Sequence, residues 1–188
     1  MKNTSNLLEI YAEKFEIFCA ELLVWSKTHN ITGYKTKADI MQNIADSIAP
    51  LGFIGDFQTA LDIGSGCGFP AIPLAISLPQ CEFILVEPQI KRASFLNIIA
   101  INLNLNNIRI LKNRIEEIST LPKIDLITSR ALAKPSKIIA LGARFLDENG
   151  HFLLYKKSAK SSADFNAKSA ESAFFYKSKQ KALKWENY

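Results

Sequence analysis

The sequence of 188 residues contains no apolar run close to the roughly 18 residues that a membrane-spanning helix requires. Its first 18 residues are too acidic for a secretory signal peptide. The three cysteines, Cys19, Cys67 and Cys81, lie far apart and form no CxxC pair, which argues against a disulfide framework and against a zinc site. We therefore expect a cytoplasmic protein with reduced thiols, no bound metal and no contact with a membrane.

Net charge is absent from the first 150 residues, where 15 Lys and Arg balance 15 Asp and Glu. Residues 151–188 carry eight lysines against three acidic residues, so they account for the whole net charge of +5. A basic segment suits a polyanionic partner such as RNA, but it could equally be a solubilising tail. Charge alone leaves both interpretations open.

The hydrophobic pattern changes near residue 57. Residues 4–27 and 40–49 have helical spacing, with Asp39 as the expected cap of the second helix, and predict an N-terminal helical extension over residues 1–50. Residues 51–188 form the second expected region, in which strands alternate with helices. The expected strands cover residues 59–63, 82–87, 108–111, 123–129 and 151–156, and the expected helices cover residues 71–78, 89–103 and 134–146. This alternation is typical of α/β proteins with a doubly wound, Rossmann-like parallel sheet.

Three glycines follow the first expected strand in the stretch LDIGSGCGFPAIPLAI, residues 61–76. A glycine-rich turn at the carboxyl end of such a strand brings the backbone close to a ligand. The dinucleotide fingerprint fails because Phe69 stands where its third glycine belongs, and no Gly-Lys-Ser/Thr of a phosphate-binding loop follows. A nicotinamide-dependent oxidoreductase is therefore the weaker alternative.

Two acidic residues indicate the ligand. Asp62 lies directly before the turn with Gly64 and Gly66, where a carboxylate would repel a pyrophosphate but complement the ammonium and sulfonium groups of S-adenosylmethionine. Glu87, at the end of the second expected strand, could accept both ribose hydroxyls of either cofactor. A carboxylate that only caps the following helix is the alternative for Asp62. The residues favour a methyl-donor site.

The same stretch resembles the signature of the small-subunit (16S) ribosomal RNA guanine-N7 methyltransferases, also called methyltransferase G or glucose-inhibited division protein B. The resemblance covers about 130 residues and continues in WSKTHNIT, NIADS, LVEPQIKRASFLN, NRIEEI and SRALAKPSKII. It implies a class I methyltransferase sheet and S-adenosyl-L-methionine as cofactor. It also implies transfer of a methyl group to N7 of a guanine, guanine 527, in 16S ribosomal RNA or the small ribosomal subunit. We expect the protein to be a monomer.

The resemblance further implies the residues of the cofactor site. Contacts are expected at Gly64 and Phe69 in the turn, at Ile115 and Glu116 after the third strand, and at Arg130 after the fourth. Ile115 would flank the adenine and Glu116 would meet its exocyclic amine. Without the resemblance, these two residues would be interpreted as a short helical turn with one core and one solvated side chain.

Two basic residues are the expected catalytic residues. Arg130 is a planar fork that could hold the methionine carboxylate or the target nucleotide. Lys156 could hold a phosphate or guanine O6, with a snorkelling surface lysine as the alternative. Basic residues after strands two to four should form a rim that contacts RNA phosphates together with the tail lysines. That rim comprises Lys91, Arg92, Arg109, Lys112, Arg114, Arg130, Lys134 and Lys137.

The expected chemistry requires no general base, because guanine N7 already presents a lone pair and needs only in-line placement. The stretch TSRALAKP after the fourth strand has neither the Asn/Asp-Pro-Pro-aromatic motif of amino-nitrogen methyltransferases nor the nucleophilic cysteine of carbon-5 cytosine enzymes. Cys67, in the glycine turn, is interpreted as a small filler rather than a nucleophile.

The sequence departs from the family pattern in three places. Asn43 stands where a histidine is usual, and Tyr155-Lys156-Lys157 replaces Leu-Lys-Gly. Residues 157–172 predict a loop and residues 173–185 one late strand, but one further apolar strand would be needed for a seven-stranded sheet. Truncation, a short natural C-terminus and a frameshift all stay open. A non-catalytic RNA-binding module with a methyltransferase fold is the alternative function.

Overall fold

The computed structural model describes residues 4–130, 132–155 and 173–177. Its N-terminal part consists of helices α1 (Thr4–Ile10), α2 (Ala12–His29) and α3 (Lys37–Ile48), followed by the 3-10 turn η1 (Ala49–Gly52). None of the helices in these ranges is long and apolar enough to cross a membrane.

The cap of α3 differs from the sequence prediction. Thr36, not Asp39, is the N-cap, and its hydroxyl accepts a hydrogen bond of 3.1 Å from the Asp39 backbone N–H. The prediction of Asp39 as the cap was wrong because Thr36 has the extended backbone and the side-chain oxygen that satisfy the first turn. Asp39 lies inside that turn, where its negative charge favours the helix dipole.

Six strands form one sheet in the order β3-β2-β1-β4-β5-β6. The strands are β1 (Thr59–Ile63), β2 (Glu82–Val86), β3 (Ile108–Leu111), β4 (Ile124–Arg130), β5 (Leu146–Tyr155) and β6 (Ala173–Lys177). The first five are parallel and β6 pairs antiparallel to β5. Strand order reverses between β1 and β4, so the switch point where ligands bind in such sheets lies at their carboxyl ends. The predicted doubly wound α/β fold is confirmed, and a seventh strand would lie outside the described residues.

Strand β5 begins earlier than the sequence predicts. It runs from Leu146, so residues 147–150, which lie between the expected helix and the expected strand, belong to the strand. The pairing with β4 shifts between Ile124, which faces Leu146, and Leu126, which faces His151. The extra residues are therefore accommodated as an irregularity within the strand.

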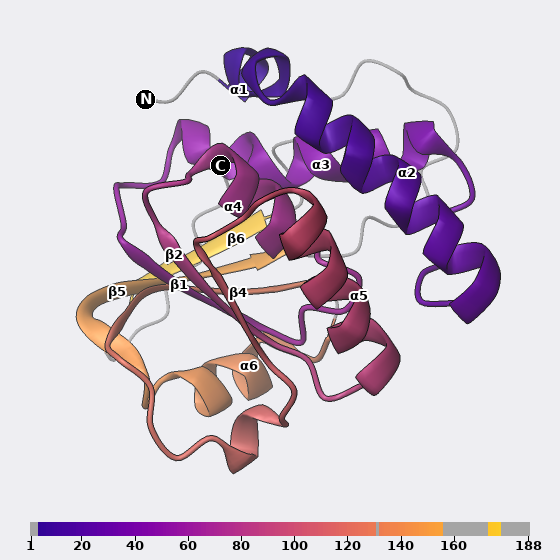
Figure 1. Cartoon of the computed structure of the whole chain (residues 1–188). Helices are drawn as coiled ribbons and strands as arrows, with labels where there is room; N and C mark the ends of the chain where they lie inside the picture. The colour runs from indigo at the N-terminus through magenta and orange to yellow at the C-terminus, as the bar shows by residue number, and fades with distance from the viewer. Residues whose placement is uncertain (1–3, 131, 156–172, 178–188) are drawn as a thin grey trace.

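The helices cover both faces of the sheet (Figure 1). Helices α4 (Ala71–Ser77) and α5 (Ile90–Asn102) lie on the face that also carries α1–α3, whereas α6 (Pro135–Gly142) and the 3-10 turn η2 (Ile115–Glu117) lie on the other. Strand side chains alternate between these two layers. Phe83 and Leu85 share one core with Phe15 and Phe18 of α2, so the N-terminal helices pack into the same core as the sheet.

Candidate functional site

The glycine turn connects β1 to α4 at the switch point. Gly64, Gly66 and Gly68 have φ values of 76°, 57° and 98°, a backbone region that side chains rarely adopt. A Cβ at Gly64 would lie 2.6 Å from Cδ2 of Leu132, but a Cβ at Gly66 would meet nothing closer than the Gly64 carbonyl at 3.9 Å. The turn therefore presents bare backbone to open space beside Gly66, where a ligand can approach closely.

Asp62 is buried at the end of β1, with 1% of its surface exposed. Its Oδ1 accepts a hydrogen bond of 2.7 Å from the Thr128 hydroxyl, while its buried Oδ2 has no partner among the described residues. Burial raises the pKa of this carboxyl from 3.8 to about 7, the hydrogen bond from Thr128 lowers it, and the Glu87 charge raises it further. A buried oxygen without a donor is costly, so Asp62 offers an acceptor to a ligand.

Glu87 connects the end of β2 to the glycine turn. It is 3% exposed, and its Oε2 accepts a hydrogen bond of 2.8 Å from the Gly66 backbone N–H. Its Oε1 accepts one of 2.9 Å from the Gln89 backbone N–H. Each carboxylate oxygen keeps a further lone pair, so the side chain is held in place and can still accept ligand hydroxyls.

A cavity of about 250 Å³ lies at the carboxyl ends of β1 and β2. The turn η2 and helix α6 border it, on the face of the sheet opposite α4 and α5. It brings together four of the predicted cofactor residues, Gly64, Glu87, Ile115 and Glu116. The sequence analysis missed Leu132, which lines the same cavity over Gly64 although it is half exposed. Leu132 lies in the SRALAKPSKII stretch, and this position was the sequence feature that could have indicated it as a cavity residue.

The backbone of the turn η2 is hydrogen-bonded to an arginine, Arg144. The Arg144 guanidinium donates hydrogen bonds to the backbone carbonyls of Ile115 at 2.8 Å and Ile118 at 3.0 Å. The Ile115 side chain is buried against the α6 layer, whereas Glu116 is exposed at the cavity. Arg144 therefore fixes the backbone of the element that carries both predicted adenine contacts, a role that the sequence analysis did not find.

The Phe69 side chain does not line this cavity. Its ring packs in an aromatic group, 5.3 Å between centroids from Phe18 and 5.6 Å from Tyr34. Only 5% of the residue is exposed. Phe69 thus anchors the turn to the N-terminal helices, and its cofactor contact stays a prediction.

Arg130, the last residue of β4, lies beneath the end of α3. Its guanidinium donates a hydrogen bond of 3.2 Å to the Ser47 hydroxyl and lies 3.7 Å from Oδ2 of Asp46. It also lies 5.4 Å above the Tyr155 ring, and the Tyr155 hydroxyl donates a hydrogen bond of 2.6 Å to the Ser47 carbonyl. The sequence analysis singled out Arg130 but not these partners. Lys156 and the tail lysines lie outside the described residues, apart from the backbone of Lys177 in β6.

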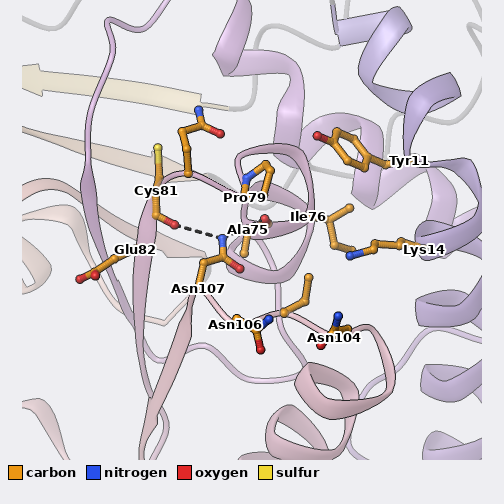
Figure 2. Close-up of a pocket in the computed structure, with 12 residues that line it drawn as sticks. Tyr11, Lys14, Ala75, Ile76, Pro79, Cys81, Glu82, Asn104, Asn106 and Asn107 are labelled. Carbon is orange, nitrogen blue, oxygen red and sulfur yellow. Dashed lines mark hydrogen bonds between the residues drawn. The ribbon is translucent and has the colours of Figure 1, made fainter.

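A second hollow of about 390 Å³ lies near the amino end of β2, between α2, α4 and the loop before β3 (Figure 2). Its wall is fixed by Asn107, whose side-chain amide donates to the carbonyls of Ala75, Leu78 and Cys81 at 3.1, 3.2 and 3.0 Å. Ligands of doubly wound sheets bind at the carboxyl ends of the strands. The functional site is therefore assigned to the opposite edge, at the glycine turn.

Comparisons with known proteins agree with this geometry. Residues 11–186 match the family model described as GidB, rRNA small subunit methyltransferase G. The chain is 51% identical over 152 residues to ribosomal RNA small subunit methyltransferase G of Helicobacter hepaticus, covering 80% of this chain and 82% of that one. It is 44% identical over 164 residues to the protein of the same name in Helicobacter pylori strain J99, covering 85% and 92%.

A solved structure shares the fold at low identity. M. jannaschii TYW2 in complex with AdoMet aligns with a TM-score of 0.55 at 18% identity, covering 63% of this chain and 54% of that one. This likeness shows the fold alone. The family match over residues 11–186 and the curated relatives above 40% identity show the family. The chain belongs to the rRNA small subunit methyltransferase G family.

Proposed function

We propose that the chain transfers a methyl group from S-adenosylmethionine to N7 of a guanine in 16S ribosomal RNA. The family membership supports this function. The observation that carries it is the buried Oδ2 of Asp62, which has no partner among the described residues at a bare glycine turn. A cationic amine is the ligand group that such an oxygen accepts best.

The residues present fit this cofactor. Asp62 would bind the ammonium group, and Glu87 would accept the ribose hydroxyls from its fixed position at 2.8 Å from the Gly66 N–H. Ile115 and Glu116 would contact the adenine across the cavity. When bound, the cofactor supplies an electrophilic methyl group on a sulfonium. Two neighbouring carboxylates with little exposure make this edge of the sheet favourable for positive charge.

The chain's own contribution to the transfer is placement. Guanine N7 carries a lone pair, so no side chain has to remove a proton before attack. Burial raises the pKa of the Cys67 thiol, which keeps it protonated and unsuited to nucleophilic attack. Arg130, at the end of the strand next to β1, would hold the target nucleotide beside the donor site. The arrangement therefore fits a nitrogen that is already nucleophilic.

Phosphate contacts are proposed for the basic rim. Arg92, Arg114 and Lys137 line the donor cavity, and Lys112 lines an adjoining hollow that it shares with Arg114. Arg109, by contrast, is an exposed residue within β3. Phosphate contacts supply affinity and position the RNA without reading its sequence. We also propose that the protein acts as a monomer in the cytoplasm. Measurement of the molecular mass of the purified chain in solution tests the monomeric state.

Calorimetric titration tests the donor site directly. S-adenosylmethionine and its demethylated product should both bind the folded chain, and NADH should not. Absence of detectable binding at millimolar cofactor would overturn the proposed function. Binding without any methyl transfer would instead support an RNA-binding module that has the fold and no turnover.

The transfer itself is tested on small ribosomal subunits from cells that lack this gene. Incubation with the chain and labelled S-adenosylmethionine should produce N7-methylguanine in 16S ribosomal RNA. The modified position is then mapped and compared with cells that carry the gene. A methyl group on another atom or another RNA would contradict the proposal.

A further inference from the structure

Asp46 and Arg130 form an ion pair whose hydrogen-bonding groups are only partly used. Their side chains are 19% and 14% exposed, and Oδ2 of Asp46 lies 3.7 Å from the guanidinium. Hydrogen bonds between such groups are about 2.7–2.9 Å long, so this pair attracts without sharing a proton. Oδ1 of Asp46 accepts from the Gln42 amide at 2.9 Å, and the guanidinium donates to Ser47. Acceptor positions and N–H donors therefore stay available side by side.

The pair lies at the carboxyl end of β4, the strand that neighbours β1. The donor cavity lies at the ends of β1 and β2, and β4 is the other neighbour of β1. Thr128 of β4 donates directly to Asp62, and Arg130 follows two residues later on the same face of that strand. The end of α3 is held over β4 and β5 by the bond between Tyr155 and Ser47. Asp46 is thus fixed over the carboxyl end of β4, the strand next to β1, on the face of the sheet that carries Asp62.

We propose that Asp46 and Arg130 read the Watson–Crick edge of the target guanine, with the carboxylate accepting from N1–H and the 2-amino group and the guanidinium donating to O6. This inference rests on the proposed function and names the residues that select its substrate base. Guanine presents two donors and then an acceptor along this edge, which is the complement of a carboxylate beside a guanidinium. Adenine presents the acceptor N1 and the 6-amino donor along this edge. The carboxylate would then face an acceptor and the guanidinium would face a donor. N7 lies on the other edge of the purine and stays free.

An aromatic side chain lies in the loop that leads into α3, the helix that carries Asp46. Tyr34 is half-buried in the loop before α3, with its ring edge against Phe69. Burial raises the pKa of the Tyr34 hydroxyl, the Arg130 charge lowers it and the Asp46 charge raises it, so both charges act on this side chain. Enzymes that act on a base extrude it and stack it on such side chains while reading its Watson–Crick edge. The three residues therefore provide a surface and a polar edge for one base.

Replacing the target guanine by inosine tests the contact, because inosine lacks only the 2-amino group. Small subunits are reconstituted with 16S ribosomal RNA that carries either base, and kcat/KM is measured for each. The unmodified chain should prefer guanine by about tenfold or more, as expected for a hydrogen bond to a charged group. Asp46→Ala should lower the guanine value and bring the preference close to one, and Asp46→Asn should reduce it. Asp39→Asn, on the same helix but in its exposed first turn, is the matched control.

The outcomes separate the possible failures. Equal losses on guanine and inosine with an unchanged preference would show that Asp46 only positions Arg130, and would overturn the inference alone. Equal use of both bases by the unmodified chain would overturn it as well. No transfer to guanine by the unmodified chain would overturn the proposed function. Cofactor affinity, measured by calorimetry, should be unchanged in Asp46→Ala and Asp46→Asn, which shows that both variants are folded.

Discussion

The donor side and the acceptor side of the site are built in different ways. The centre of the donor side lies within residues 62–87, where glycine backbone and two buried carboxylates are shaped around open space, and η2 and Leu132 complete the cavity. The acceptor side joins α3 to the ends of β4 and β5 through hydrogen bonds that span 83 and 108 residues. A small cofactor of constant shape suits a rigid backbone pocket, whereas an RNA base is read by charged side chains that keep unused donors and acceptors.

The largest expected effect is the loss of cofactor binding in Gly64→Val. The new Cβ would lie 2.6 and 2.9 Å from the two terminal carbons of Leu132, at a φ of 76° that valine does not tolerate. Calorimetry should show no binding at millimolar S-adenosylmethionine. Gly33→Val is the matched control, because a Cβ there meets nothing within 4 Å. Normal cofactor binding by Gly64→Val would show that the donor side does not depend on a rigid glycine backbone.

Arg130→Ala should separate the two sides. Loss of a charged hydrogen-bonding group should lower kcat/KM for methyl transfer by about 10- to 100-fold. We expect this loss to be at least as large as the loss of cofactor affinity, since the described contacts of the guanidinium lie on the acceptor side. Lys123→Ala, which removes an exposed lysine just before the amino end of β4, is the control. A larger effect on cofactor affinity would place Arg130 on the donor side.

Cofactor affinity should depend on pH through Asp62. The carboxyl of the free chain is protonated below about pH 7, and its charged form is the one that binds an ammonium group. Affinity should therefore rise as the pH increases through 7, and fall again above about pH 8 as an α-amino group loses its proton. Titrations between pH 6 and 9 test this profile. Asp62→Asn should bind the cofactor weakly and should not show the rise in affinity as the pH increases through 7. Asp62→Ala should abolish cofactor binding.

The same carboxyl should make the free energy of unfolding depend on pH. Its pKa is raised from 3.8 to about 7, so between these values the folded chain keeps a proton that the unfolded chain has released. Stability should then decrease as the pH rises from about 4 to 7 and level off above it. Denaturant unfolding of Asp62→Asn should lack this decrease. An identical pH profile for both chains would show that Asp62 is not buried as described.

The smallest expected effect concerns the rim. Lys112→Gln should weaken RNA binding slightly and reduce the slope of log affinity against log salt by about 0.9, the value for one phosphate contact on duplex nucleic acid. Cofactor affinity should stay the same, because Lys112 lines the adjoining hollow rather than the donor cavity. Lys123→Gln, at the opposite end of β4, should leave the slope unchanged. Equal slopes for both variants would mean that this position makes no phosphate contact.

Local patterns in the sequence were sufficient for the donor side. The strand before the glycines, the acid at its end and the acid at the end of the next strand all follow from alternation and turn chemistry. Parallel pairing then brings Asp62 and Glu87 to one edge, where the Gly66 N–H donates to the Glu87 carboxylate. These local patterns do not predict the direction of each side chain. Phe69 lies in the turn, but its ring packs on Phe18, because the N-terminal helices cover that face.

The acceptor side could not be assembled from the sequence. Asp46, Ser47, Arg130 and Tyr155 belong to three segments, and no periodicity shows which of them meet in space. The resemblance marked the segments separately without joining them. The prediction of the α3 cap was wrong for a related reason. Thr36 and Asp39 are both good cap residues, and the backbone angles at Thr36 decide between them.

The hydrogen bond between Tyr155 and Ser47 also sets an order of events during synthesis. A ribosome adds roughly 5–20 residues per second, so the 108 residues between these partners take on the order of 5–20 s to translate. During that interval α3 has been made, while the ends of β4 and β5 that it covers are still being added. The glycine turn and Glu87 are complete long before Tyr155 is joined to the chain. A growing chain therefore acquires the parts of its donor pocket before it can assemble the surface that selects a base.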